Sequence, residues 1–270
     1  MIFGLFAIIV YMAEYILTRK TRNIASSAVH VLLNLVFGVG TVLLTLYTSS
    51  PVLGLILVAI SKWRVFAVRS RYIWLNFKSN LLDFIVGVSV VLITYYSGNV
   101  LVLDILLAIF YCVWLIVIKP LTSEIGTLSQ ALIAVFLGMS SSAIISAGSD
   151  PLAIVVMAFI VGYSASRHII SQSESKGYGL LTLVCGLIFA EIAWLCQAWM
   201  IVYTFGKTGI RVPQVAIILT LFTFLFYNVH LAAIKRDGEV KMSDIMAPLI
   251  FSAVITAVIV LWFSSPIFNI

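Results

Sequence analysis

Few side chains in the apolar stretches of this chain could do chemistry, and Glu191 is the most deeply placed of them. It stands twelve residues after Gly179, where an apolar stretch begins. In a helix that rises 1.5 Å per residue, Glu191 then lies about 18 Å in, near the middle of a membrane. A carboxylate at that depth is costly and often marks a proton or cation pathway. The alternative is a hydrogen-bonded Glu that only joins helices.

Four more polar residues lie within apolar stretches. Asn34 is expected at a similar depth, where it could hydrogen-bond across helices, with Glu191 as one partner. Asp104 is expected near the outer surface, and Asp83 and Glu14 near the inner surface, where each reaches interfacial water or pairs with a base. We take Glu191, Asn34, Asp104, Asp83 and Glu14 as candidates for a substrate or ion pathway.

Bases and aromatic residues alternate in residues 62–78, which read KWRVFAVRSRYIWLNFK. Trp and Tyr favour the headgroup zone of a membrane, and clustered bases favour anionic lipid. One interpretation is an anchor in an anionic inner leaflet. The other is a pocket for a phosphorylated headgroup or another anionic ligand, because guanidinium groups suit phosphate geometry. The candidates for binding such a group are Lys62, Arg64, Arg69, Arg71 and, from a later stretch, Arg167.

Motifs for cofactor or metal chemistry are missing from the sequence. The three cysteines form no C-x-x-C pair, and no two histidines have the i, i+3 or i, i+4 spacing of a helical metal site. There is no G-x-x-x-x-G-K-[ST] nucleotide loop. We therefore assign no catalytic residue, no metal site and no cofactor, and the sequence favours a protein that is not an enzyme.

The composition identifies the environment that must position these residues. Of the 270 residues, 63% are hydrophobic and 10% are charged, and the mean hydropathy is +1.18. Soluble domains are about 45–50% apolar and about 25% charged, so the chain is an integral membrane protein. We expect an all-α polytopic bundle that forms one membrane domain over 1–270. The net charge of +6 then reflects basic cytoplasmic loops, not binding to nucleic acid.

Polar breaks divide the chain into ten candidate spans of about 20 residues. They are roughly 1–18, 24–47, 51–68, 79–97, 99–118, 127–147, 150–170, 179–205, 211–234 and 244–264. With all ten crossing, every base except Lys207 and Arg211 falls on one side. The positive-inside rule then predicts a multi-pass protein of the cell membrane with both termini outside. The span 51–68 is the weakest, because its apolar part ends at Ser61.

Two parts of the chain resemble each other. The segment FYCVWLIVIK, which ends at Lys119, matches FYNVHLAAIK, which ends at Lys235, and the turns before Pro51 and Pro151 also match. We interpret this as two four-span units, 24–119 and 127–235. Because four is even, both units have the same orientation and are related by an axis along the membrane normal, an arrangement found in transporters.

These features favour a transporter or permease for a small solute, coupled to protons or another cation. One alternative is a lipid-handling protein, either a flippase or a binding protein for anionic lipid or polyprenyl phosphate. The other is a non-catalytic subunit that helps to assemble a membrane complex. The expected partners are the bilayer, anionic lipids of the cytoplasmic leaflet, and a second copy or another membrane subunit, with no nucleic acid.

Overall fold

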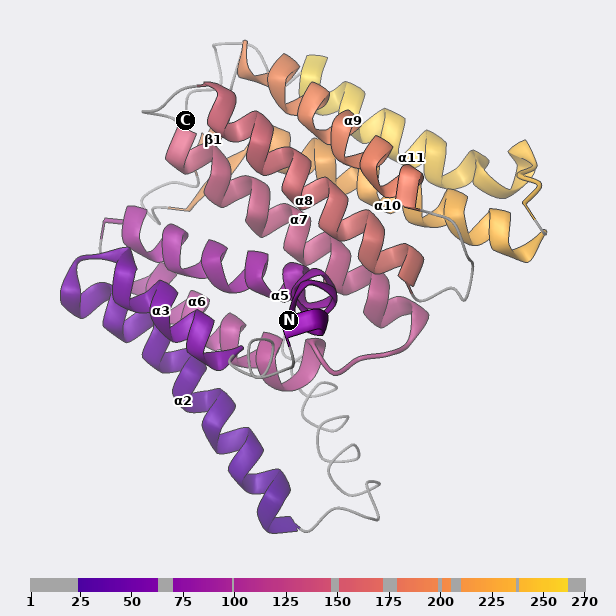
Figure 1. Ribbon diagram of the computed structural model, residues 1–270. Helices are drawn as coiled ribbons and strands as arrows, with labels where there is room; N and C mark the ends of the chain where they lie inside the picture. Colours follow the sequence, from indigo (N-terminus) through magenta and orange to yellow (C-terminus); the bar gives the residue numbers. More distant parts are fainter. Residues whose placement is uncertain are drawn as a thin grey trace.

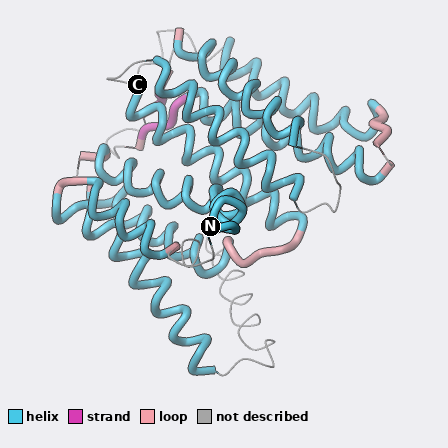
Figure 2. The backbone as a smooth tube through the Cα atoms, viewed as in Figure 1, coloured by secondary structure: helices cyan, strands magenta, loops and turns pink. Residues whose placement is uncertain are grey.

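The chain folds into a bundle of apolar helices in the computed structural model, which describes residues 24–62, 70–98, 100–146, 151–171, 179–198, 201–204, 210–236 and 238–261. The helices in order are α2 (Ile24–Thr48), α3 (Pro51–Ser61), α5 (Ser70–Tyr96), α6 (Leu101–Val113), the π-helix η1 (Trp114–Ile118), α7 (Glu124–Ser146), α8 (Pro151–Ser171), α9 (Gly179–Gln197), α10 (Gln214–Lys235) and α11 (Met242–Leu261). Figure 2 shows that helices make up nearly all of the described chain.

Eight helical spans in the described chain are long and apolar enough to cross a membrane, with α6 and η1 forming one of them. This agrees with a multi-pass helical membrane protein. The expected span 1–18 lies outside the described residues. The expected span 51–68 is described only to Lys62, and its helix α3 has 11 residues, fewer than the roughly 17 that a crossing needs.

Helix α9 is shorter than its apolar composition predicts. The expected span 179–205 was wrong at its far end, because α9 ends at Gln197. Residues Val202–Thr204 form a strand, β1, which pairs antiparallel with β2 (Arg211–Pro213). The β-branched residues Val202 and Thr204 suit this extended pairing better than a helix.

The core lies where α5, α7 and α8 meet in the middle of the bundle, between α2, α3 and α6 on one side and α9, α10 and α11 on the other (Figure 1). Small residues allow these helices to approach closely. A Cβ atom at Gly138 of α7 would lie 2.9 Å from Ile85 and 3.0 Å from Val161. Ser141 of α7 donates a hydrogen bond to the hydroxyl of Ser89 on α5 at 3.1 Å. Close packing and this hydrogen bond hold α5 against the centre of the bundle.

Candidate functional site

A buried carboxylate, Asp83 of α5, is bound by side chains from two other parts of the chain. The ammonium groups of Lys62, just after α3, and Lys119, just after η1, both pair with Oδ2 of Asp83, the latter at 2.5 Å. The indole Nε1 of Trp114 donates a hydrogen bond to Oδ1 at 2.8 Å. Both carboxylate oxygens are therefore bound, as a buried charge requires. We call these four residues the Asp83 cluster.

The π-helix η1 explains how Trp114 and Lys119 reach the same carboxylate. In a regular α-helix with 3.6 residues per turn, two positions five residues apart point about 140° away from each other. Here the backbone N–H of Lys119 donates to the carbonyl of Trp114 at 2.9 Å, so the turn contains an extra residue. The wider turn brings both side chains to the side of the helix that faces Asp83. Single π turns of this kind are frequent at functional sites.

The Asp83 cluster carries one more positive charge than its carboxylate neutralises. Lys62 is buried, with only 3% of the residue exposed, whereas the side chain of Lys119 is 40% exposed. Lys119 is therefore the member of the cluster that an ion or solute approaching from the protein surface contacts first. Removing one partner of a buried ion pair typically costs about 3–5 kcal/mol, because a charge is left without compensation.

A second pair of polar side chains holds the end of η1 against α7 and α8. Nε2 of Gln130 donates to the carbonyls of Ile118, Lys119 and Leu121 at 2.6–3.2 Å. Nε2 of His168 lies 2.7 Å from Oε1 of Gln130 and donates to it, because an amide oxygen can only accept a hydrogen bond. The position of the Lys119 backbone thus depends on both α7 and α8.

Further polar groups follow the same face of α5 away from the Asp83 cluster. The hydroxyl of Tyr111 lies against Gly87, where a Cβ atom would be 2.8 Å from it. Thr94 comes two turns later, and then Ser97, which donates to Asp104 at 3.1 Å. The hydroxyls of Tyr111 and Thr94 are buried without a hydrogen-bond partner among the described residues. From Asp83 to Ser97 this face is about 21 Å long.

The line of polar groups ends at a small cavity of about 120 Å³ beside Ser97. Its lining includes Tyr96, Ser140 of α7 and Arg211 of β2. At about 30 Å³ per molecule, roughly four waters would fill it. The cavity lies at the C-terminal end of α5, whereas Asp83 is in the middle of this helix. This end is on the side that the basic residues predict to be external.

The other residues that the sequence singled out do not join this cluster. Nδ2 of Asn34 lies 2.8 Å from Nδ1 of His30 on its own helix. Helix α2 stands on the opposite side of the bundle from α9, which carries Glu191 (Figure 1). Glu191 is exposed on the outward face of α9. Arg167 of α8 donates to the hydroxyl of Tyr163 at 3.3 Å.

The proposed anionic-ligand residues are only partly visible in the described chain. Arg64 and Arg69, like Glu14 of the proposed pathway, lie outside the described residues. Arg71 belongs to the first turn of α5. Lys62 points inward to Asp83 instead of toward a headgroup.

Four residues around Asp83 and η1 were not among the sequence-based candidates: Trp114, Lys119, Gln130 and His168. Trp114 and Lys119 do stand in the ten-residue segment that is repeated later in the chain, which is a signal that could have drawn attention to them. Gln130 carries no charge and belongs to no motif, so only the packing of α7 against η1 reveals its role.

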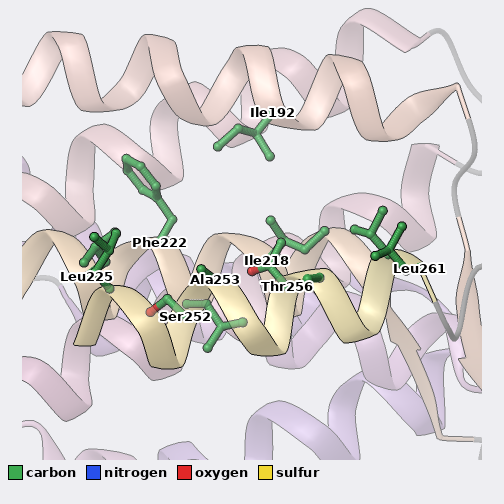
Figure 3. A pocket seen from close by; sticks show the side chains of 12 residues that line it. Ile192, Ile218, Phe222, Leu225, Ser252, Ala253, Thr256 and Leu261 are labelled. Atoms are coloured by element: carbon green, nitrogen blue, oxygen red, sulfur yellow. The ribbon is translucent and has the colours of Figure 1, made fainter. Parts of the chain in front are cut away.

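A larger hollow lies on the other side of the bundle, between α9, α10 and α11. It has a volume of about 580 Å³ and an almost wholly apolar lining, to which Ser252 and Thr256 add hydroxyls. Figure 3 shows Ile192 of α9 facing Ala253 of α11 across it. We call it the α9–α11 groove.

Neither a search for metal-binding groups nor a comparison with known proteins indicates a function. Within the described ranges, no group of three or more His, Cys, Asp or Glu side chains is placed to hold a metal ion. No protein-family model, curated protein or solved structure matches the chain.

Proposed function

We propose that this protein is a membrane transporter or permease for a small solute, with Asp83 as the carboxylate that couples transport to a proton or another cation. The observation that carries the proposal is the Asp83 cluster, in which one buried carboxylate meets two lysines. Trp114 already joins α6 and η1 to Asp83, and Lys62 already neutralises its charge, so the partly exposed Lys119 is not needed to hold these helices together. An exchange of partners during transport gives the second lysine a use.

The polar face of α5 supports a pathway from the Asp83 cluster to the small cavity. Tyr111 and Thr94 each bury a hydroxyl without a partner in the described chain, which costs about 1–3 kcal/mol per group unless water or a solute binds there. The fully buried Val86 and Val90 stand between these polar groups. The pathway is therefore closed in this conformation, and transport requires the helices around α5 to move.

The contacts among helices support the two-unit organisation. In the first unit, α2 contacts α3, α3 contacts α5, and α6 contacts both α2 and α5. In the second unit, α7 contacts α8, α8 contacts α9, and α10 contacts both α7 and α9. These four contacts correspond helix by helix, whereas the contacts of α2 with α5 and of α8 with α10 have no counterpart of this size. In our proposal the units 24–119 and 127–235 move against each other, and α5 lies at their boundary because it contacts both α7 and α8.

The coupling role falls on Asp83 instead of Glu191 because of their surroundings. Asp83 is buried among groups with which it can exchange a proton or an ion. Glu191 is exposed on an outward helix face, away from the polar face of α5. The flux experiment below therefore includes a Glu191→Gln variant, which tests the alternative prediction that Glu191 couples transport.

Flux into liposomes tests this proposal. Purified protein is reconstituted with a pH-sensitive dye inside, and proton movement is driven by a potassium diffusion potential, with and without external phosphate, chloride or acetate. We expect the wild-type protein to exceed empty liposomes with at least one of these solutes. Asp83→Asn should lower that flux by about tenfold or more, since an intramembrane carboxylate of a relay has lost its proton site.

The matched control is Asp244→Asn, the same change at an acid in a partly exposed ion pair with Arg236 between α10 and α11, which should keep the flux of the wild type. Each variant is first checked for wild-type helicity and a single gel-filtration peak. Flux equal to that of empty liposomes, or wild-type flux in Asp83→Asn, would contradict the proposal. Loss of flux in Glu191→Gln alone would move the coupling site to Glu191.

A lipid-handling function is the second candidate, and the α9–α11 groove favours it. At about 27 Å³ per methylene, a 580 Å³ apolar hollow is large enough for one acyl or prenyl chain, which is the kind of ligand that an apolar, membrane-facing surface attracts. Native mass spectrometry distinguishes the two functions. A lipid that stays bound to the wild-type protein and is lost in Ala253→Trp, which fills the groove, would favour lipid handling.

A further inference from the structure

The small cavity at the C-terminal end of α5 has a lining of two chemical kinds. Most of its described lining residues are aliphatic or Phe, and they come from α5, α6, α7 and the chain around β2. The others are Tyr96, Ser97, Ser140 and Arg211, and among the described lining residues only Arg211 is charged. The cavity therefore offers one positive charge and three hydroxyl groups within an apolar wall.

The hydroxyl of Ser140 is the clearest sign that this cavity holds a ligand. Ser140 is 4% exposed, and its Oγ has no hydrogen-bond partner among the described residues. A buried hydroxyl in this state is costly unless water or a ligand binds it. Ser97, in contrast, already donates to the carbonyl of Thr94 at 2.7 Å and to Asp104 at 3.1 Å. Asp104 itself is not part of the lining.

The charge of Arg211 is also available to a ligand. Its strand, β2, pairs with β1, and this pairing places Arg211 opposite Thr204. Arg211 is exposed, so a ligand can reach it from the protein surface. Within the described chain no acid forms an ion pair with it. The cavity thus combines an uncompensated guanidinium group with an unpartnered hydroxyl group.

We propose that the small cavity binds a short monocarboxylate of two or three carbons, and that this is the solute of the protein. The guanidinium group of Arg211 suits a carboxylate because it donates two parallel hydrogen bonds. The hydroxyl of Ser140 supplies a further donor, and the apolar wall contacts the alkyl end. The identity of the solute rests on the transport function proposed above, whereas binding to the cavity can be measured without transport.

The size and the lining of the cavity favour such a ligand over other anions. At about 30 Å³ per water-sized group, the volume of about 120 Å³ holds roughly four or five non-hydrogen atoms, as in acetate or propionate. An inorganic anion such as nitrate would lose its hydration against the apolar wall and gain no apolar contact in return. A neutral amide of the same shape would leave the charge of Arg211 unused.

The inner part of the polar face of α5 favours an anion as well. The Asp83 cluster holds two ammonium groups for one carboxylate, so an uncompensated positive charge stands near both ends of this face. Charges of one sign along a path attract solutes of the opposite sign. The cavity also lies between α5 and α6 of the first unit and α7 of the second, and transporters built from repeats bind their substrates at such a boundary.

Saturation-transfer difference NMR on the purified protein in deuterated detergent tests this binding, with propionate as the ligand and nitrate and propionamide as competitors. We expect the wild-type protein to give a saturable propionate signal that propionamide and nitrate displace only weakly. Arg211→Gln should weaken propionate binding by about tenfold, because it removes charge-assisted hydrogen bonds. The matched control is Arg236→Gln, at an arginine that pairs with Asp244 between α10 and α11, which should keep the affinity within about twofold.

Several results would overturn the proposal. Propionate that binds Arg211→Gln as tightly as the wild-type protein would show that the cavity is not its site. Propionamide or nitrate that competes as well as unlabelled propionate would show that the ligand is not a carboxylate with an alkyl end. The liposome assay with propionate separates this inference from the transport function. Flux with another solute and no binding of propionate would overturn the ligand alone, whereas binding that depends on Arg211 without any flux would support the site and contradict transport.

Discussion

In the proposed two-unit organisation, helices α3, α5 and α6 align with α8, α9 and α10, and the aligned positions carry very different side chains. In the proposed alignment of the two units, Lys62, Asp83 and Trp114 correspond to Gly162, Thr182 and His230. The first set forms a charged cluster that binds three parts of the chain together. Thr182 donates only to Gly179 of its own helix, and Gly162 packs against the ring of Phe189. One unit is therefore joined by charge at these positions, and the other by close packing.

Lys119 and Lys235 end the two copies of the repeated segment, but only Lys119 belongs to a charged cluster. Lys119 follows the π-helix η1 and pairs with Asp83. Lys235 ends α10, which remains α-helical, and is exposed. The same residue type at the same point of the repeat thus has two different environments. A carboxylate on the neighbouring helix and the extra residue of the π turn together make the difference.

In the proposed transport cycle, the two units have different parts. Ion pairs can exchange partners when helices move, whereas close van der Waals packing resists small displacements. Gln130 and His168 join the second unit to the end of η1, so a movement between the units changes the position of Lys119. In the proposed transport cycle, the second unit would then be the support against which the first unit changes its ion pairs.

The largest expected effect comes from removing the charge that distinguishes the first unit. Asp83→Asn leaves two ammonium groups without a counter-charge, one of them buried, and should lower the free energy of unfolding by about 3–5 kcal/mol. Thr182→Val, at the matching position, removes one hydrogen bond within α9 and should cost less than about 1.5 kcal/mol. Denaturant unfolding in detergent micelles measures both. Equal losses would mean that the Asp83 cluster contributes no more to stability than a local hydrogen bond.

A smaller effect is expected from disturbing the close packing of the second unit. In Gly162→Ala, the new Cβ atom would collide with the ring of Phe189, and overpacking of this kind costs about 1–3 kcal/mol. The control is Gly179→Ala at the start of α9, where a Cβ atom would meet nothing within 4 Å. The free energy of unfolding should fall for the first variant and stay near the wild-type value for the second. If both behave alike, the contact between α8 and α9 is not tightly packed.

Most of the helices could be predicted from the sequence, because an apolar run of about 20 residues has few alternatives to a membrane helix. The run 150–170, for example, became α8 (Pro151–Ser171). The prediction failed where composition and backbone preference disagree. Residues 198–205 are apolar enough to continue α9, but Val202–Thr204 pairs as a strand with Arg211–Pro213.

The site could be predicted only in fragments. Asp83 and Lys62 were both singled out, but in two separate hypotheses, since nothing in the sequence says that α3 packs against α5 at that depth. The π turn at Trp114–Ile118 follows no known residue pattern, so the approach of Lys119 to Asp83 could not be foreseen. The outward direction of Glu191 could not be predicted either, because which way a helix faces depends on its neighbours.

The smallest effect on stability should come from substituting the two matching lysines, Lys119 and Lys235. These two substitutions compare the units most directly. Lys235 is exposed at the end of α10, so Lys235→Met should change the free energy of unfolding by less than about 0.5 kcal/mol. Lys119→Met should cost less than about 1 kcal/mol, because its ion pair is partly exposed to solvent and Lys62 still neutralises Asp83. Flux in the liposome assay should nevertheless separate them, falling severalfold in Lys119→Met alone. Equal flux in both variants would mean that the second lysine of the Asp83 cluster has no part in transport.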